Sequence, residues 1–180
     1  MIHTYRECID KWQSDYQIKK QIAAGDLFQI EKGLYSDTPD VSTLAVISAK
    51  YPKAVFTMDS AFYYHGLTDV IPDVYHIATD KHSVRLTDRR IRQYYYQSDI
   101  LDRGVIIMKR RDAAFRIYDR ERMLIELLRY KNKLPFDYYK EVLRNYRSLI
   151  HELDIERIQE YAATFPKPKM ISEELDSEVF

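Results

Sequence analysis

One short stretch near the start of the chain combines side chains that can bind nucleic acid. Gln17 and Gln21 carry amides that can hydrogen-bond to base edges, and Lys19 and Lys20 can neutralise phosphates or contact a guanine. Lys32 follows at an expected turn, where it can reach a phosphate. These residue types indicate DNA contact, provided that the local structure presents them on one surface.

Local signals predict two helices around this stretch. Thr4 can cap a helix over residues 5–12, and Ser14 can cap a second helix that runs to Ala24. Gly25 can end the second helix, because glycine adopts the left-handed backbone of a helix C-terminus without strain. The two predicted helices are therefore joined by a very short turn.

The second helix has two different faces. Ile18 and Ile22 lie four residues apart and mark the buried side. At about 100° per residue, the opposite side carries polar residues and a tyrosine. The predicted DNA-binding residues are Ser14, Tyr16, Gln17, Lys19, Lys20, Gln21 and Lys32.

The next residues predict a β-hairpin, with strands near 27–30 and 34–35 and a turn between them. Helix, tight turn, helix and hairpin is the element order of a winged helix-turn-helix, whose second helix enters the major groove. We therefore predict an α+β fold, with a winged helix-turn-helix over residues 1–38. Two observations keep a purely structural role open: such units also occur without DNA, and residues 1–40 have a net charge of −2.

A turn-rich junction at 36–40 precedes a longer segment, predicted as a mixed α/β domain over residues 41–165. Strands are expected at 54–56, 74–79 and 91–96, and a hairpin at 104–108 with 114–118. Helices are expected up to Tyr64, after Asp119, and near 136–149 and 154–164. Residues 166–180 are predicted to be an acidic, mobile tail.

The charge is unevenly spread although the chain is neutral overall, with 28 basic and 28 acidic residues. Residues 81–147 hold 18 basic and 9 acidic residues, a net charge of +9. Such a block suits a polyanion or an acidic partner, but it also fits ordinary solvated helix faces. The 16 tyrosines, which suit half-buried surfaces and interfaces, add to the expectation of a partner.

Cellular location follows from two simpler features. The single cysteine, Cys8, excludes an internal disulfide, and no apolar run is long enough for a signal peptide or a membrane span. We therefore expect a cytoplasmic protein with no membrane partner.

Candidate catalytic and metal-binding groups are weaker. His65, Asp69, Asp73 and His76 could bind a metal, but turns at Gly66 and Pro72 separate them, which favours structural or capping roles. Ser60 and His65 have no third partner and no nucleophile-elbow motif. Of the tyrosines at 94–96, only the first and third can share a strand face, where core packing is favoured over base stacking. We predict no enzyme activity, no metal and no cofactor.

Three segments resemble one known family. Residues 25–35 resemble the wing, 54–72 the second-domain entry and 118–129 a later helix of AbiEi-type antitoxins, which belong to type IV toxin–antitoxin systems. The entry segment contains Gly66-Leu67-Thr68-Asp69 before a proline, and the later helix opens with Glu121-Arg122. The resemblance extends over roughly residues 4–150, in order and at the expected spacings.

The resemblance implies an antitoxin that also represses transcription of its own operon. The winged helix of such a protein binds inverted repeats in promoter DNA, and its second domain counters a nucleotidyltransferase-like toxin, with which it need not form a stable complex. The chain departs from the family in its short, slightly acidic N-terminal unit. The alternative is a protein-interaction or RNA-binding module that uses the basic 81–147 block and does not bind DNA.

Overall fold

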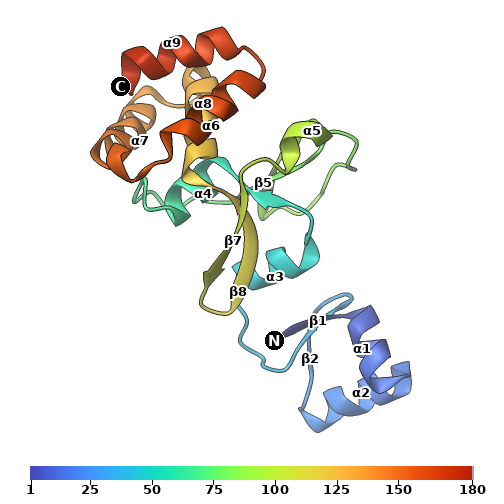
Figure 1. Cartoon of the computed structure of the whole chain (residues 1–180). Coiled ribbons are helices and arrows are strands. Elements are labelled where there is room, and N and C mark those ends of the chain that lie inside the picture. The colour runs from blue at the N-terminus through green and yellow to red at the C-terminus, as the bar shows by residue number, and fades with distance from the viewer. Residues whose placement is uncertain (180) are drawn as a thin grey trace. The chain divides into compact units, whose positions relative to one another are not determined.

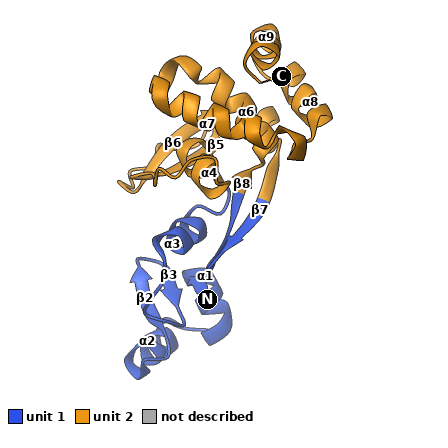
Figure 2. Cartoon of the chain, turned by 90° about the vertical axis from the view of Figure 1, so that its left-hand side faces the viewer, with its two compact units in different colours: residues 1–54, 107–116 blue, residues 55–106, 117–180 orange. Residues whose placement is uncertain are grey.

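The computed structural model describes residues 1–179 and has a mixed α+β fold, as predicted. The chain folds into two compact units, which Figure 2 shows in blue and orange. Unit 1 comprises residues 1–54 and 107–116, and unit 2 comprises residues 55–106 and the chain from 117 onward. The first unit is therefore discontinuous in sequence, because a hairpin from the middle of the chain completes it.

Unit 1 contains a small antiparallel sheet with three helices (Figure 1). Strand β3 is central, and both β1 and β2 pair with it in antiparallel register. Strand β1 was not predicted, since three residues are too few for a periodic signal. The elements are β1 (Ile2–Thr4), α1 (Tyr5–Trp12), α2 (Asp15–Ala24), β2 (Phe28–Glu31), β3 (Leu34–Ser36) and α3 (Thr43–Lys50).

The predicted caps of the first two helices are confirmed. Thr4 caps α1 and forms a reciprocal capping box with Glu7. The Ser14 hydroxyl accepts the Gln17 N–H and starts α2, and Gly25 ends it in the left-handed conformation. Because these signals are local, the sequence was sufficient to place both helices.

The core of unit 1 forms where α1 and α2 meet the sheet. Its fully buried members are Cys8, Ile18 and Leu27, with Tyr35 almost as deep. Packed against them are the half-buried side chains of Ile9, Trp12 and Ile22. Helix α3 also contacts β1 and β3, so unit 1 extends past the predicted boundary at 38–41. The observed units thus differ from the predicted ranges 1–38 and 41–165.

A five-stranded mixed sheet has the strand order β6-β5-β4-β8-β7; β4, β5 and β6 belong to unit 2, and most of the β7–β8 hairpin belongs to unit 1. Strand β4 pairs with β5 antiparallel and with β8 in parallel, and β5 pairs with β6 in parallel. The strands are β4 (Val55–Phe56), β5 (Tyr75–Asp80), β6 (Ile91–Tyr96), β7 (Val105–Arg110) and β8 (Ala113–Tyr118). All five lie near predicted strands, but β7 runs two residues further than expected, which leaves a turn of only two residues.

Helix α6 is the centre of the helical part of unit 2. It contacts α4, α7, α8 and α9, so its whole circumference is covered (Figure 1). Asp119 caps it, and its predicted stripe at 123, 124, 127 and 128 is fully buried. The helices are α4 (Met58–Tyr64), α5 (Ser98–Leu101), α6 (Arg120–Arg129), α7 (Phe136–Ser148), α8 (Ile155–Thr164) and α9 (Pro168–Glu178), with 3-10 turns at 131–133 and 150–152.

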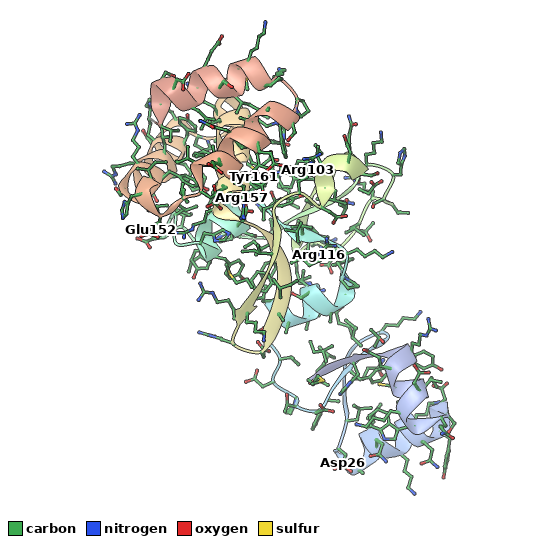
Figure 3. The ribbon with its side chains drawn as sticks, in the orientation of Figure 1. Asp26, Arg103, Arg116, Glu152, Arg157 and Tyr161 are labelled. Carbon is green, nitrogen blue, oxygen red and sulfur yellow. The ribbon has the colours of Figure 1, made fainter. Side chains whose placement is uncertain are left out.

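Asp119 also links α6 to α8. The Tyr161 hydroxyl donates to an Asp119 oxygen at 2.9 Å, and the Arg157 guanidinium lies 3.6 Å from the same carboxylate oxygen. Tyr161 and Arg157 are labelled on α8 in Figure 3. One carboxylate therefore starts α6 and holds α8 against it.

The expectation of a mobile tail at 166–180 is wrong for residues 168–178. They form α9, which packs against α8 and α6 and buries Ile171 and Leu175. Two of its acidic residues are paired as well: Glu174 and Glu178 bind Lys131, at 2.6 and 3.1 Å. The acidic composition suggested solvation, but the apolar i,i+4 pair on the other face determines that the segment packs.

Candidate nucleic-acid interface

Helix α2 presents the polar face that the sequence predicts. Tyr16 is 73% exposed, and Gln17, Lys19 and Lys20 are exposed as well. Ile18, which is 2% exposed, holds the other face in the core, with Ile22 half-buried beside it. Because Ile18 and Ile22 fix the rotation of the helix, the amide and ammonium groups have to face solvent.

Two of the predicted residues have a more restricted position. Gln21 is half-buried at the edge of the exposed face. Ser14 is also half-buried, and its hydroxyl oxygen accepts the Gln17 backbone N–H at 3.3 Å. Its primary role is thus to start α2, although its hydroxyl hydrogen can still donate to a phosphate.

Lys32 lies at the exposed turn of the β2–β3 hairpin, as predicted. Gly33 beside it has φ of 79°, a left-handed conformation that suits glycine. The Gly33 carbonyl accepts the Tyr5 N–H at 2.9 Å, which fixes the turn to the start of α1. Glu31 is paired with Lys50 at 2.9 Å, so the carboxylate nearest in sequence to Lys32 is already engaged.

Four further cations of unit 1 were not singled out from the sequence. The β7–β8 hairpin contributes Lys109, Arg110, Arg111 and Arg116, of which the first three are exposed. With them unit 1 holds eleven basic and eight acidic residues, a net charge of +3, whereas residues 1–40 alone have −2. The run Lys-Arg-Arg is visible in the sequence, but only the fold assigns it to the same unit as α2.

Hydrogen bonds attach this hairpin to the rest of unit 1. The Asp112 carboxylate accepts the Ser42 N–H at 2.8 Å and its hydroxyl at 2.7 Å. These bonds lower the pKa of Asp112, so its carboxylate is negatively charged at neutral pH. The Arg116 guanidinium, labelled in Figure 3, donates to the Lys53 carbonyl at 2.9 Å.

The two histidines of the possible metal site, His65 and His76, have separate structural contacts. The ring of His65 is hydrogen-bonded to the Tyr118 carbonyl at 2.7 Å, and the Ser60 hydroxyl accepts the His76 backbone N–H. Within residues 1–179, no three His, Cys, Asp or Glu side chains are grouped closely enough to bind a metal ion.

His76 is part of a buried polar cluster that the sequence did not predict. Its Nδ1 lies 3.1 Å from the Tyr94 hydroxyl, and its Nε2 lies 3.6 Å from an Asp59 oxygen. Burial lowers the pKa of His76, against the opposing effect of Asp59, and it raises the pKa of Tyr94 to about 12. At neutral pH both groups are therefore uncharged. Because the Tyr94 hydroxyl stays protonated, it is not activated as a nucleophile.

This burial predicts an acid-sensitive stability. Because the pKa of folded His76 is below the unfolded value of about 6.5, the unfolded chain takes up a proton first as the pH falls. Stability from this residue is therefore complete above pH 6.5 and is lost below it, by at most about 1.4 kcal/mol per pH unit. Urea unfolding at pH 7.5 and 5.5 should show a smaller pH dependence for His76→Gln than for wild type. An equal pH dependence in both would show that folding does not lower the pKa of His76.

The tyrosines at 94–96 alternate across strand β6, as expected. Tyr96 is 4% exposed and Tyr95 is 48% exposed, while Tyr94 packs on His76 and Tyr130. This placement agrees with core packing for the first and third residues.

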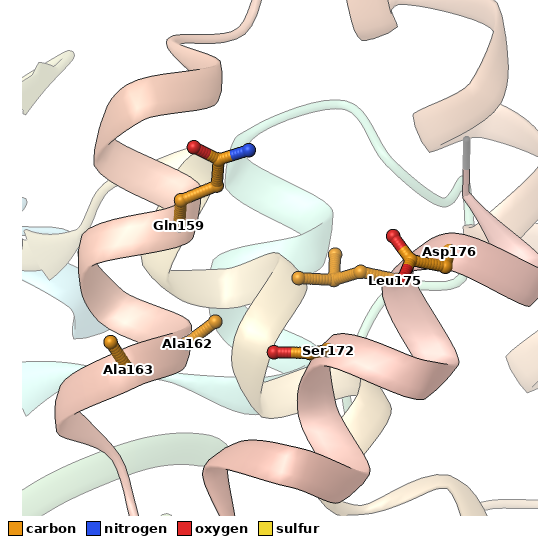
Figure 4. A pocket seen from close by; sticks show the side chains of 6 residues that line it. All are labelled: Gln159, Ala162, Ala163, Ser172, Leu175 and Asp176. Atoms are coloured by element: carbon orange, nitrogen blue, oxygen red, sulfur yellow. The ribbon is translucent and has the colours of Figure 1, made fainter.

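A pocket of about 260 Å³ lies between α8 and α9 (Figure 4). Its lining combines small side chains with a few polar ones: Gln159, Ala162, Ala163, Ser172, Leu175 and Asp176. These six side chains include no cation that could bind a phosphate.

Comparison with known proteins adds no assignment. No protein-family model matches the chain, and no curated protein matches it in sequence. None of the helices over residues 1–179 has both the length and the apolar character required to cross a bilayer.

Proposed function

We propose that the chain is a DNA-binding transcriptional regulator, with α2 of unit 1 as its recognition helix. The observation that carries this proposal is the outward face of α2, where Gln17 and Lys20 are exposed on a helix anchored by Ile18. Amides and amines are the groups that distinguish base edges in the major groove. The short turn after α1 and the hairpin after α2 form the framework that supports α2.

The winged helix-turn-helix arrangement is part of this proposal. The order β1, α1, α2, β2, β3, in which β1 and β2 both pair with β3, agrees with such a domain. Lys32 at the tip of the β2–β3 hairpin is then the wing contact to a phosphate. The net charge of +3 for unit 1 favours a polyanionic partner.

We further propose that the regulator is the antitoxin of a type IV toxin–antitoxin operon. This step is supported by the resemblance of residues 25–35, 54–72 and 118–129 to AbiEi-type antitoxins. The chain represses its own promoter at inverted repeats and counters a nucleotidyltransferase-like toxin without enzymatic activity of its own. Unit 2 is the proposed antitoxin part, since it lies outside the DNA-reading elements.

The competing function, RNA or protein binding by a continuous basic block at 81–147, has less support. Ion pairs engage several of its cations, including Arg122 with Glu126, Lys131 with Glu174 and Lys140 with Glu178. Its residues 107–116 also belong to a different compact unit from the remainder. The basic block in the sequence therefore does not belong to one compact unit.

Repression of a reporter gene tests the proposal. A promoter fragment from directly upstream of the gene should be repressed by the wild-type chain and released by Gln17→Ala/Lys20→Ala. The control Lys81→Ala/Gln97→Ala removes the same two residue types from exposed positions of unit 2 and should repress normally. Repression that survives the α2 substitutions would contradict the assignment of the recognition helix.

The antitoxin step has its own test in the same cells. The gene that directly follows is expected to encode the toxin, and its induction should stop growth unless this chain is present. Rescue by Gln17→Ala/Lys20→Ala would agree with neutralisation through unit 2. Failure of the wild-type chain to rescue would contradict the antitoxin role and leave the DNA-binding proposal in place.

A further inference from the structure

We propose that the tip of the β7–β8 hairpin, Lys109-Arg110-Arg111, is a second phosphate-contacting element of unit 1, on the same duplex that α2 reads. This inference rests on the proposed DNA-binding function and extends it to residues outside the first 54. The three cations are consecutive and exposed, and the two-residue turn at Arg111-Asp112 places them at the end of a hairpin.

The charge of unit 1 depends on this hairpin. Residues 1–54 contain seven basic and seven acidic side chains, so they are neutral on their own. Residues 107–116 add four basic side chains and one acidic side chain, which is the whole net charge of +3. Lys and Arg side chains that contact phosphates release counterions, so this excess of positive charge favours DNA binding.

Buried residues and one carboxylate hold the hairpin in place, while Lys109 and Arg111 are exposed. Ala113 and Phe115 of β8 are buried, at 7% and 3% exposure. Asp112, the one carboxylate in the segment, is turned onto Ser42, which is also the N-cap of α3. The carboxylate therefore serves as an anchor, while neighbouring Lys109 and Arg111 remain available to an external anion.

The backbone at the tip gives an independent indication. Arg111 has φ of 48°, in the left-handed region that glycine adopts freely and that is unfavourable for other residues. Glycine is the residue that this conformation alone would favour. An arginine held there is explained if its guanidinium contacts a phosphate.

A phosphodiester backbone suits this tip better than an acidic protein surface does. The exposed, flexible cations Lys109 and Arg111 suit the regularly repeated charges of a duplex, and such contacts position a protein without reading sequence. The hairpin should therefore strengthen binding to every sequence alike, unlike α2.

The test is fluorescence anisotropy of the full chain with its promoter duplex and with an unrelated duplex of equal length, over a series of salt concentrations. Lys109→Ala/Arg111→Gly should weaken both duplexes alike and reduce the slope of log K against log[salt] by about 2, from roughly 0.9 per phosphate contact. Lys81→Ala/Arg85→Ala, which removes two exposed cations of unit 2, should leave the slope unchanged. Arg111→Gly should have a Tm at or above that of wild type, so weaker binding cannot be attributed to unfolding.

The outcomes separate this inference from the proposed function. A wild-type chain that binds neither duplex would overturn both. Normal wild-type binding with an unchanged slope in the hairpin variant would overturn the hairpin inference alone. A hairpin variant that loses affinity only for the promoter would overturn it too, because that result indicates base contacts in place of phosphate contacts.

Discussion

Replacement of Arg122 by alanine is expected to lower the free energy of unfolding by about 3–5 kcal/mol, because it removes the fully buried partner of the Glu126 carboxylate, which then keeps only the partly exposed Arg129. Arg122 and Glu126 are both 0% exposed, and their charged atoms lie 2.7 Å apart. The guanidinium also stacks over Phe165 at 3.9 Å and donates to the Ile100 carbonyl at 2.8 Å. One arginine thus connects α6 with α5 and with the end of α8.

Urea denaturation followed by tyrosine circular dichroism measures this loss. Arg120→Ala is the matched control, since Arg120 lies in the same helix but pairs with Glu152 at the surface, where both side chains are substantially exposed. Exposed pairs contribute about 0–1 kcal/mol. Equal destabilisation by the two substitutions would contradict the central role of the buried pair.

Truncation of Leu175 to alanine is expected to cost about 2–5 kcal/mol, the range for leucine in a packed core. Leu175 is 3% exposed in α9, within the segment that the sequence suggested was mobile. The loss arises from the contacts of α9 with α8 and α6. Thermal unfolding should show a lower Tm for Leu175→Ala than for wild type.

Glu173→Ala is the control for this helix, because Glu173 is exposed two residues away. It should leave the Tm nearly unchanged. A Tm for Leu175→Ala equal to that of Glu173→Ala would show that α9 does not pack in solution.

The elements that could be predicted from the sequence are those whose ends are determined by residues close to them in the chain. Thr4, Ser14 and Gly25 mark the ends of helices through bonds within a few residues, so α1 and α2 could be placed without the structure. The same holds for Asp119 and the apolar stripe of α6. Strand β1 could not be found, since its only signal is pairing with β3 more than thirty residues later.

One part of the candidate site could likewise be predicted from local sequence, and another part could not. The outward face of α2 follows from the spacing of Ile18 and Ile22 alone. The contribution of Lys109 and Arg111 depends on a hairpin that returns to unit 1 from residue 107, which no local pattern encodes. The cluster of Asp59, His76 and Tyr94 likewise forms from three separate elements.

The claim that α2 recognises a DNA sequence is tested most directly by measuring how well the chain discriminates between two DNA sequences. The ratio of affinities for the promoter duplex and an unrelated duplex, at one fixed salt concentration, isolates base recognition from phosphate attraction. The wild-type chain should prefer the promoter, and Gln17→Ala/Lys20→Ala should reduce that preference by about 1–3 kcal/mol for each lost base contact. An unchanged preference in this double variant, with the variant fully folded, would contradict recognition by α2.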